Sequence, residues 1–193
     1  MSPSSARSGK SSQSVKIVVT GPYGVGKTTL IQTVSEAAVV STEKGVSDYA
    51  GGPKKRTTVA MDFGRISIDR DLVLYLFGTP GQKRFDFMWQ ILAEGMLGFV
   101  VLIDDQRPET LRESAEILTF FRDVAEVPYV VAVNKVAGDP ADALARARSR
   151  LQVPDGVRVV ACDALDRESV KAVLLELLYA VLDDLGATTR AAV

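Results

Sequence analysis

The loop that joins an apolar run to the following helix constrains this chain more than any other feature. Residues 21–28 read GPYGVGKT, which fits the pattern G-x-x-x-x-G-K-[ST], directly after the apolar run Val15–Thr20. Backbone N–H groups of such a loop, with the dipole of the helix that it opens, attract phosphate. Unless the match is a coincidental glycine-rich turn, Lys27 reaches the outer phosphates and the Thr28 hydroxyl binds Mg²⁺. The residues expected to contact a nucleotide here are Gly21, Tyr23, Gly24, Val25, Gly26, Lys27, Thr28 and Thr29.

The composition favours one domain and excludes several kinds of function. The chain has 193 residues, of which 47% are hydrophobic and 24% charged, enough for a sizeable core. A net charge of −1 argues against a nucleic-acid partner, and no apolar run reaches the roughly 20 residues that cross a bilayer. The absence of histidine excludes catalytic triads that use histidine and metal sites with histidine ligands. The single Cys162 cannot form an internal disulfide, so we expect a cytoplasmic protein without membrane insertion.

The chain divides into a domain and two tails. Residues 1–14 are rich in serine and are expected to be disordered, 15–186 form the domain, and 187–193 form a short C-terminal tail. Strands are predicted at 15–20, 59–68, 72–77, 98–103, 129–133 and 157–160. Helices are predicted at 27–38, 85–94, 109–125, 140–151 and 170–185, and residues 41–56 are predicted to form a polar loop.

This alternation predicts an α/β fold with three layers. We expect a mostly parallel six-stranded sheet with helices on both faces, and one antiparallel strand that comes from a hairpin around Asp69–Asp71. In such sheets ligands bind at the carboxyl ends of the strands. The loops after the strands are therefore the places to look for function.

A second candidate phosphate segment, Gly78–Gln82, follows the strand 72–77 and reads GTPGQ. Together with the loop at 21–28 it resembles the Ras-like small GTPases, whose members carry Asp-x-x-Gly-Gln at this place. The resemblance implies a P-loop fold in which Gly81 senses the γ-phosphate and Gln82 orients the attacking water. Gly78 occupies the position of the family's aspartate, which steadies the Mg²⁺ hydration shell, so metal binding is weaker or uses a substitute. A plain Gly-Pro turn is the alternative.

The segment 57–63, TTVAMDF, resembles the switch segment of Rab-like proteins. By this resemblance Thr58 binds Mg²⁺ with its hydroxyl and the γ-phosphate with its N–H, and Thr28 is the other metal ligand. Thr57 competes for this role, and both threonines also suit an edge strand. Arg56 and Arg84 flank the two switch segments, and each is either an internal arginine finger or a solvated surface charge. The implied catalytic residues are Gln82, Lys27 and Arg56.

The base-binding segment departs from the family pattern. Asn134 and Lys135 match the first two residues of Asn-Lys-x-Asp, but Ala137 replaces the aspartate that accepts two hydrogen bonds from guanine. The loss of that acceptor weakens guanine discrimination by roughly 1–3 kcal/mol. Asp139 is a substitute if the loop shifts, a hypothesis motivated by its proximity. The family's last base-contacting segment falls loosely on Ala161, Cys162, Asp163 and Ala164.

Three details narrow the resemblance: Pro80–Gln82 follow Gly78 and Thr79 with no Asp, Tyr23 lies in the phosphate loop, and the block 57–64 is followed by 72–82. In these details the chain resembles the GTP/ATP-binding proteins of bacterial conservons and the related Mgl-type GTPases. That resemblance implies a roadblock/LC7-type regulatory partner and recruitment to a sensor-kinase-like membrane complex. The segment Phe85–Trp89 has four large apolar residues in five positions. These cannot share one helical face, so we expect at least one of them to be exposed. They form either a partner surface or simply the core face of the second helix.

The sequence thus predicts a nucleotide-dependent switch that binds GTP or GDP with Mg²⁺ and hydrolyses GTP slowly. The main alternative is a degenerate nucleotide-binding scaffold, for GTP or ATP, with little hydrolysis. A small-molecule kinase is disfavoured, because the spacing of Arg146, Arg148 and Arg150 distributes them around a helix.

Overall fold

The structure of the chain is a computed structural model that describes residues 13–37, 42–47, 56–69, 71–81 and 85–191. Within these ranges it gives the backbone alone for 42–47, 56–60 and 188–191. The strands are β1 (Gln13–Thr20), β2 (Thr42–Ser47), β3 (Arg56–Asp69), β4 (Leu72–Gly78), β5 (Gly98–Asp104), β6 (Tyr129–Asn134) and β7 (Arg158–Cys162). The helices are α1 (Lys27–Val34), α2 (Phe87–Ala93), α3 (Leu111–Val124), α4 (Pro140–Arg150) and α5 (Arg167–Ala191), with a 3₁₀ turn η2 (Pro108–Thr110).

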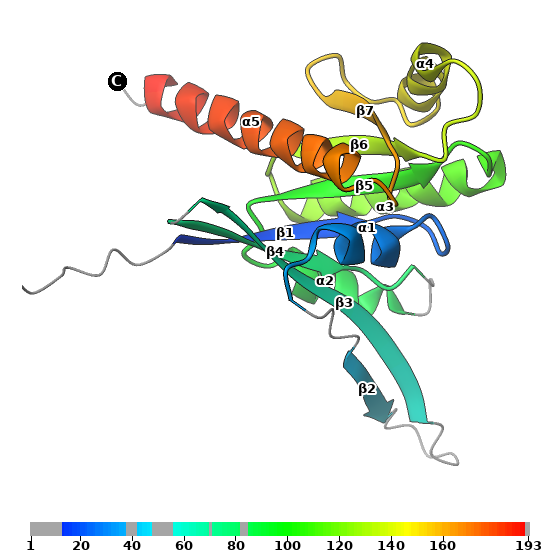
Figure 1. Cartoon of the computed structure of the whole chain (residues 1–193), viewed down its shortest axis with the longest axis vertical. Helices are drawn as coiled ribbons and strands as arrows, with labels where there is room; N and C mark the ends of the chain where they lie inside the picture. The colour runs from blue at the N-terminus through cyan, green and yellow to red at the C-terminus, as the bar shows by residue number, and fades with distance from the viewer. Residues whose placement is uncertain (1–12, 38–41, 48–55, 70, 82–84, 192–193) are drawn as a thin grey trace, which may run out of the picture.

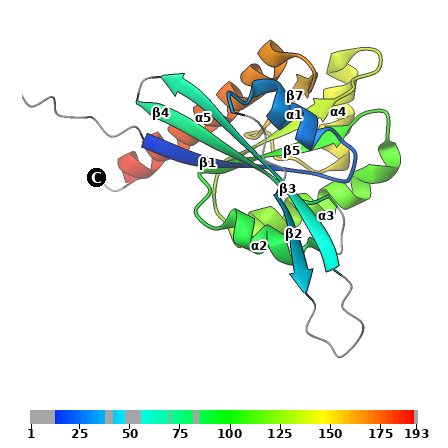
Figure 2. The same cartoon turned by 60° about the horizontal axis from the view of Figure 1, so that its bottom comes forward.

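The sheet has the order β2-β3-β4-β1-β5-β6-β7. Strands β4, β1, β5, β6 and β7 are parallel, and β3 is antiparallel to β4. These six strands confirm the predicted fold class. The seventh strand, β2, pairs antiparallel with the outer part of β3, which projects away from the other strands (Figures 1 and 2).

Several element bounds differ from those expected, and three of the differences change how a stretch of chain is assigned. Strand β2 lies inside residues 41–56, which were expected to form a loop, because this polar segment pairs with β3. Strand β1 begins at Gln13, where it pairs with Leu72, so two residues assigned to the N-terminal tail are in the sheet. Helix α5 continues to Ala191 through most of the segment assigned to the C-terminal tail.

Apolar side chains of the central strands alternate between two cores. Ile17 and Val19 face a core with α1 and α5, whereas Val18 faces a core with α2, α3 and α4. Figure 1 shows α1 and α5 in front of the strands and α3 behind them. All seven residues of β5 are buried, as expected for a parallel strand covered on both faces. This rigid sandwich fixes the carboxyl ends of β1, β5 and β6 at one edge of the sheet.

Across the part of the chain that the structure describes, every helix is too short or too polar to span a lipid bilayer.

Candidate nucleotide site

The loop 21–28 joins β1 to α1, as the sequence predicts, and its backbone needs glycine at two crowded points. Gly21 has φ 141°, and a Cβ there would overlap the carbonyl oxygen of Leu102. Gly26 has φ 108°, and a Cβ there would lie 2.7 Å from the Asn134 amide nitrogen. The loop is therefore packed directly against the ends of β5 and β6.

Lys27 folds back over the loop that precedes it. Its Nζ donates to the carbonyl oxygens of Gly21 and Pro22, both at 2.7 Å. The side chain is buried, and this desolvation lowers the pKa of Lys27 to about 8, against the opposing attraction of Asp62 and Glu113. An anion beside this ammonium group would favour its charged form.

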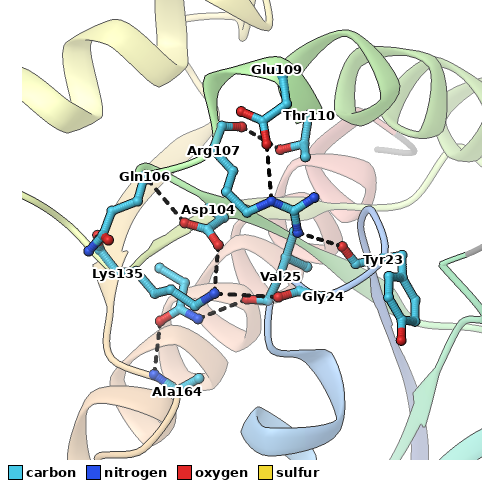
Figure 3. A network of polar contacts seen from close by, with 11 residues as sticks. Tyr23, Gly24, Val25, Asp104, Gln106, Arg107, Glu109, Thr110, Lys135 and Ala164 are labelled. Atoms are coloured by element: carbon cyan, nitrogen blue, oxygen red, sulfur yellow. Dashed lines mark hydrogen bonds and ion pairs between the residues drawn. The ribbon is translucent and has the colours of Figure 1, made fainter.

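The remaining carbonyl oxygens of the loop are held from outside. Three side chains donate to three successive ones: Arg107 Nη1 to that of Tyr23 at 3.0 Å, Lys135 Nζ to that of Gly24 at 3.4 Å, and Asn134 Nδ2 to that of Val25 at 2.8 Å. Figure 3 shows the two basic side chains, Arg107 and Lys135, both reaching toward the loop. The sequence predicts Asn134 and Lys135 near the nucleotide, and the structure brings both to the phosphate loop.

Asn134 and Lys135 also connect this loop to the neighbouring strand ends. Lys135 Nζ lies 2.6 Å from Oδ2 of Asp104, a fully buried carboxylate at the end of β5 (Figure 3). Asn134 accepts, through Oδ1, a 3.1 Å hydrogen bond from the N–H of Ala164, which follows β7. One polar network thus ties β5, β6 and the loop after β7 to the phosphate loop.

The loop after Lys135 has no family aspartate, and its candidate substitute has another partner. Asp139 begins α4 as its N-cap, and its carboxylate accepts a 2.7 Å hydrogen bond from the N–H of Ala141. Ala137 donates its own N–H to Asp105 at 3.1 Å. In this conformation Oδ1 of Asp139 caps the helix, so at least one of its two carboxylate oxygens is already engaged.

The residues predicted to contact the base lie at the end of β7 and directly after it. Ala161 is exposed within β7, Cys162 is buried, and Asp163 accepts a 2.9 Å hydrogen bond from the N–H of Leu165. Burial, reinforced by the charge of Asp163, raises the pKa of the Cys162 thiol to about 12, which fits a structural residue. Ala164, the last residue of the predicted segment, lies beside Asn134, and the following Leu165 is 79% exposed.

The candidate metal site has a carboxylate that sequence reasoning did not assign. The Thr28 hydroxyl donates to Oδ2 of Asp62 at 2.5 Å, and Asp62 is buried. Asp62 lies opposite Gly78 in the β3–β4 ladder. A Cβ at Gly78 would lie 3.0 Å from that of Asp62, so glycine at this position leaves room for the carboxylate. Hydroxyl and carboxylate oxygens are the ligands that Mg²⁺ prefers, so this pair fits the ion that the fold implies.

The turn that follows β4 lies against the phosphate loop. Thr79 is anchored to β1 through its N–H, which donates to Val19 at 2.9 Å, and its hydroxyl is 2.9 Å from that of Thr20. A Cβ at Gly81 would lie 2.7 Å from both Lys27 Nζ and the backbone nitrogen of Tyr23. The predicted γ-phosphate sensor therefore touches the loop at the donors that an outer phosphate would use.

For several predicted site residues the structure describes no side-chain position. Gln82 and Arg84 lie outside the described residues. Arg56 and Thr58 lie in the outer part of β3, paired with β2, and only their backbone is described; the same holds for Thr57.

The predicted partner segment is divided between the core and the surface. Phe85 and Trp89 are buried, whereas Phe87 is 51% exposed, which confirms that at least one apolar residue faces outward. Trp89 Nε1 donates to the carbonyl oxygen of Pro80 at 3.2 Å. This hydrogen bond joins the buried face of α2 to the turn that carries Gly81.

Comparison with known proteins assigns the chain to a family. The profile of a family described as "Conserved hypothetical ATP binding protein" matches residues 19–184, which include the phosphate loop and every strand end described above. The chain belongs to this family. The family's description names nucleotide binding, and the loop at 21–28 gives this chain a P-loop, in agreement with the predicted resemblance to P-loop proteins.

The chain is also similar to three individual proteins. The chain is 35% identical over 121 residues to "Uncharacterized protein MJ1339" of Methanocaldococcus jannaschii, covering 63% of this chain and 70% of that protein. It is 26% identical over 112 residues to "Intraflagellar transport protein 22" of Chlamydomonas reinhardtii, covering 58% and 54%. It is 27% identical over 121 residues to "Translation initiation factor IF-2" of Leptospira interrogans, covering 62% of this chain but 12% of that protein.

Proposed function

We propose that this protein is a Mg²⁺-dependent nucleotide switch that binds GTP and hydrolyses it slowly. The observation that carries this proposal is the close approach of Gly81 to the phosphate loop, where a Cβ on Gly81 would lie 2.7 Å from Lys27 Nζ and from Tyr23 N. These two donors suit an outer phosphate, and a phosphate placed at them would displace the turn that now lies there. Occupation of the site and movement of the turn are thereby coupled, which is the requirement for a switch.

The residues around the loop suit phosphoryl transfer to water. Lys27 and the loop N–H groups would offset charge on the outer phosphates. Thr28 and Thr58 would hold Mg²⁺, and Asp62 would stand in for the aspartate that Gly78 replaces; the ion supplies charge neutralisation between the phosphates. Gln82 would orient the attacking water, and Arg56 would contribute positive charge. Without a partner, turnover should be on the order of 10⁻⁴ to 10⁻² s⁻¹.

The residues at the base position differ from those that select guanine in the family resembled. Ala137 offers no side-chain acceptor to guanine, and Asp139 is engaged as a helix cap. The family's description names ATP instead. We therefore keep ATP as a second candidate ligand for the same site.

The resemblance to conservon and Mgl-type proteins extends the proposal to partners. A roadblock/LC7-type protein, acting with a sensor-kinase-like membrane complex, would read the position of the turn and of α2. In support, α2 begins six residues after Gly81 and exposes Phe87 and Ile91 one helical turn apart, at 51% and 62%. Cytoplasmic location with recruitment through such partners follows from the same proposal.

Calorimetric titration with GDP, GTP, ADP and ATP, each with and without Mg²⁺, tests the proposal together with measured phosphate release. Tighter binding of GTP in the presence of Mg²⁺, with slow release of one phosphate, is the expected result. Binding without release would favour the scaffold alternative, and a preference for ATP would change the ligand but keep the switch. No binding of any of the four nucleotides would reject the proposal.

A further inference from the structure

The three outer donors act on three consecutive peptide units of the phosphate loop. Each carbonyl belongs to the same unit as the N–H of the next residue: Tyr23 with Gly24, Gly24 with Val25, and Val25 with Gly26. The peptide bonds are trans, so the carbonyl and the N–H of one unit point in opposite directions. A carbonyl held from outside therefore turns its N–H toward the phosphate side.

Asn134 and Lys135 are adjacent in the chain and account for two of these units. The third unit, Tyr23–Gly24, is held by Arg107, which is 84 residues away from Tyr23 in the sequence. We propose, on the basis of the nucleotide-binding function proposed above, that Arg107 is a positioning residue that orients and polarises the Tyr23–Gly24 peptide for phosphate binding.

Arg107 is itself held by its surroundings. Its Nε lies 3.2 Å from Oε1 of Glu109, and its carbonyl oxygen accepts a 2.8 Å hydrogen bond from the Thr110 hydroxyl (Figure 3). Its N–H donates to the carbonyl of Asp104 at 3.1 Å, the residue whose carboxylate holds Lys135. The end of β5 thus positions both basic side chains that reach the loop.

The space above Gly24 is matched to the guanidinium group. A Cβ at Gly24, which has φ 79°, would lie 2.9 Å from Arg107 Nη1, so the guanidinium occupies the place of a side chain at that position. A hydrogen bond from a charged donor is stronger than a neutral one, and it increases the polarity of the peptide that accepts it.

The test compares Arg107→Ala and Arg107→Lys with the matched control Arg112→Ala. Arg112 lies on α3 with its side chain 91% exposed and paired with Glu116 at 3.5 Å, away from the loop contacts described above. For each protein, the dissociation constants of GDP, GTP and ATP, hydrolysis at saturating nucleotide, and the unfolding midpoint without nucleotide are measured. The Arg107 side chain is 39% exposed, so its replacement should leave the fold intact.

We expect Arg107→Ala to raise the dissociation constants of diphosphate and triphosphate alike, by about tenfold, because the peptide contacts both. Hydrolysis at saturation should change by less than about twofold, since ground state and transition state are affected equally. Arg107→Lys should recover part of the affinity, and Arg112→Ala should match the unaltered protein.

Unchanged dissociation constants for Arg107→Ala would overturn the inference, even if the unfolding midpoint falls, because only a stabilising role would remain. A loss of hydrolysis at saturation with unchanged GDP affinity would also overturn it, in favour of direct contact with the reacting phosphate. If the unaltered protein binds none of the nucleotides, the proposed function fails as well, which distinguishes the two failures.

Discussion

Asp62 lies directly across the β3–β4 ladder from Gly78 and occupies the space that a side chain at Gly78 would need. Its carboxylate accepts a hydrogen bond from the hydroxyl of Thr28, the proposed metal ligand. In Ras-like proteins, by the resemblance, the acid stands at the position of Gly78. Here a carboxylate reaches the same place from the neighbouring strand, and side chains at the two positions would crowd each other.

This relationship predicts that the acid can be moved back across the ladder. Asp62→Ala should raise the Mg²⁺ concentration needed for half-maximal hydrolysis by about tenfold. Gly78→Asp alone should destabilise the protein, since its Cβ would lie 3.0 Å from both Asp62 Cβ and Ile31 Cδ1 and would add a second negative charge. The double variant Asp62→Gly/Gly78→Asp, which removes the Cβ at position 62 together with its carboxylate, should recover much of the lost Mg²⁺ affinity.

Titration of hydrolysis with Mg²⁺, alongside thermal unfolding, measures both effects. Asp71→Ala, at the exposed end of the same hairpin, is the control for removing a negative charge. An Asp62→Ala variant with ordinary Mg²⁺ dependence would remove this carboxylate from the metal site.

The buried ammonium of Lys27 predicts a pH-dependent stability. Burial lowers its folded-state pKa to about 8, whereas the unperturbed value is 10.5. Between these values the unfolded chain binds more protons at this residue than the folded chain, so stability rises as the pH increases from 8 to 10.5. Below pH 8 both states are protonated and the contribution is constant. The full rise is about 3 kcal/mol.

Denaturant unfolding of the unaltered protein and of Lys27→Met, each from pH 7 to 10.5, isolates this effect as a difference. The variant should lack the rise. Nucleotide affinity should show the opposite trend and weaken above pH 8, because phosphates favour the charged amine. Parallel stability curves for the two proteins would contradict the assignment.

Trp89 is placed to report the state of the turn. It is the single tryptophan, its indole N–H donates to Pro80 O at 3.2 Å, and its ring packs 5.3 Å from that of Phe120. Movement of the turn by a γ-phosphate should break or lengthen the hydrogen bond, because Pro80 precedes Gly81. A non-hydrolysable triphosphate should therefore shift the fluorescence emission, whereas the diphosphate should not. Equal spectra with both nucleotides would show that the turn does not respond to the γ-phosphate.

Sequence reasoning located those parts of the site whose geometry is local. The loop 21–28 and the strand-end pair Asn134–Lys135 are contiguous patterns, and both lie where the topology predicts. Asp62 was missed because its role depends on strand register, which pairs it with Gly78. The hairpin around Asp69–Asp71 was predicted, and counting outward from it would have placed these two residues opposite each other.

Arg107 and Asp139 show two further reasons why the site in the structure differs from the site that the sequence predicts. The contact of Arg107 joins residues that are 84 positions apart, and no local pattern marks it. Asp139 directly precedes Pro140 at the start of α4, an arrangement typical of an N-cap, but its proximity to Ala137 suggested a base contact. A carboxylate near a site serves whichever donor the backbone presents to it.

The close approach of Gly81 to the phosphate loop predicts that a single methyl group disturbs the proposed switch. In Gly81→Ala the Cβ would lie 2.7 Å from Lys27 Nζ and from Tyr23 N, so the turn cannot keep its present position. Displacement should also misplace the following Gln82, and hydrolysis should fall by tenfold or more, in the range expected for loss of one positioned catalytic group. Diphosphate affinity should change less, because the contact involves the donors proposed for the outermost phosphate.

Single-turnover hydrolysis and diphosphate binding, measured for Gly81→Ala and for Gly156→Ala, separate this effect from a general cost of replacing glycine. Gly156 is a suitable control because a Cβ there meets no described atom within 4 Å. The control should behave as the unaltered protein. Hydrolysis by Gly81→Ala at the ordinary rate would show that the turn accommodates the methyl group and that its contact with the loop is not part of the reaction.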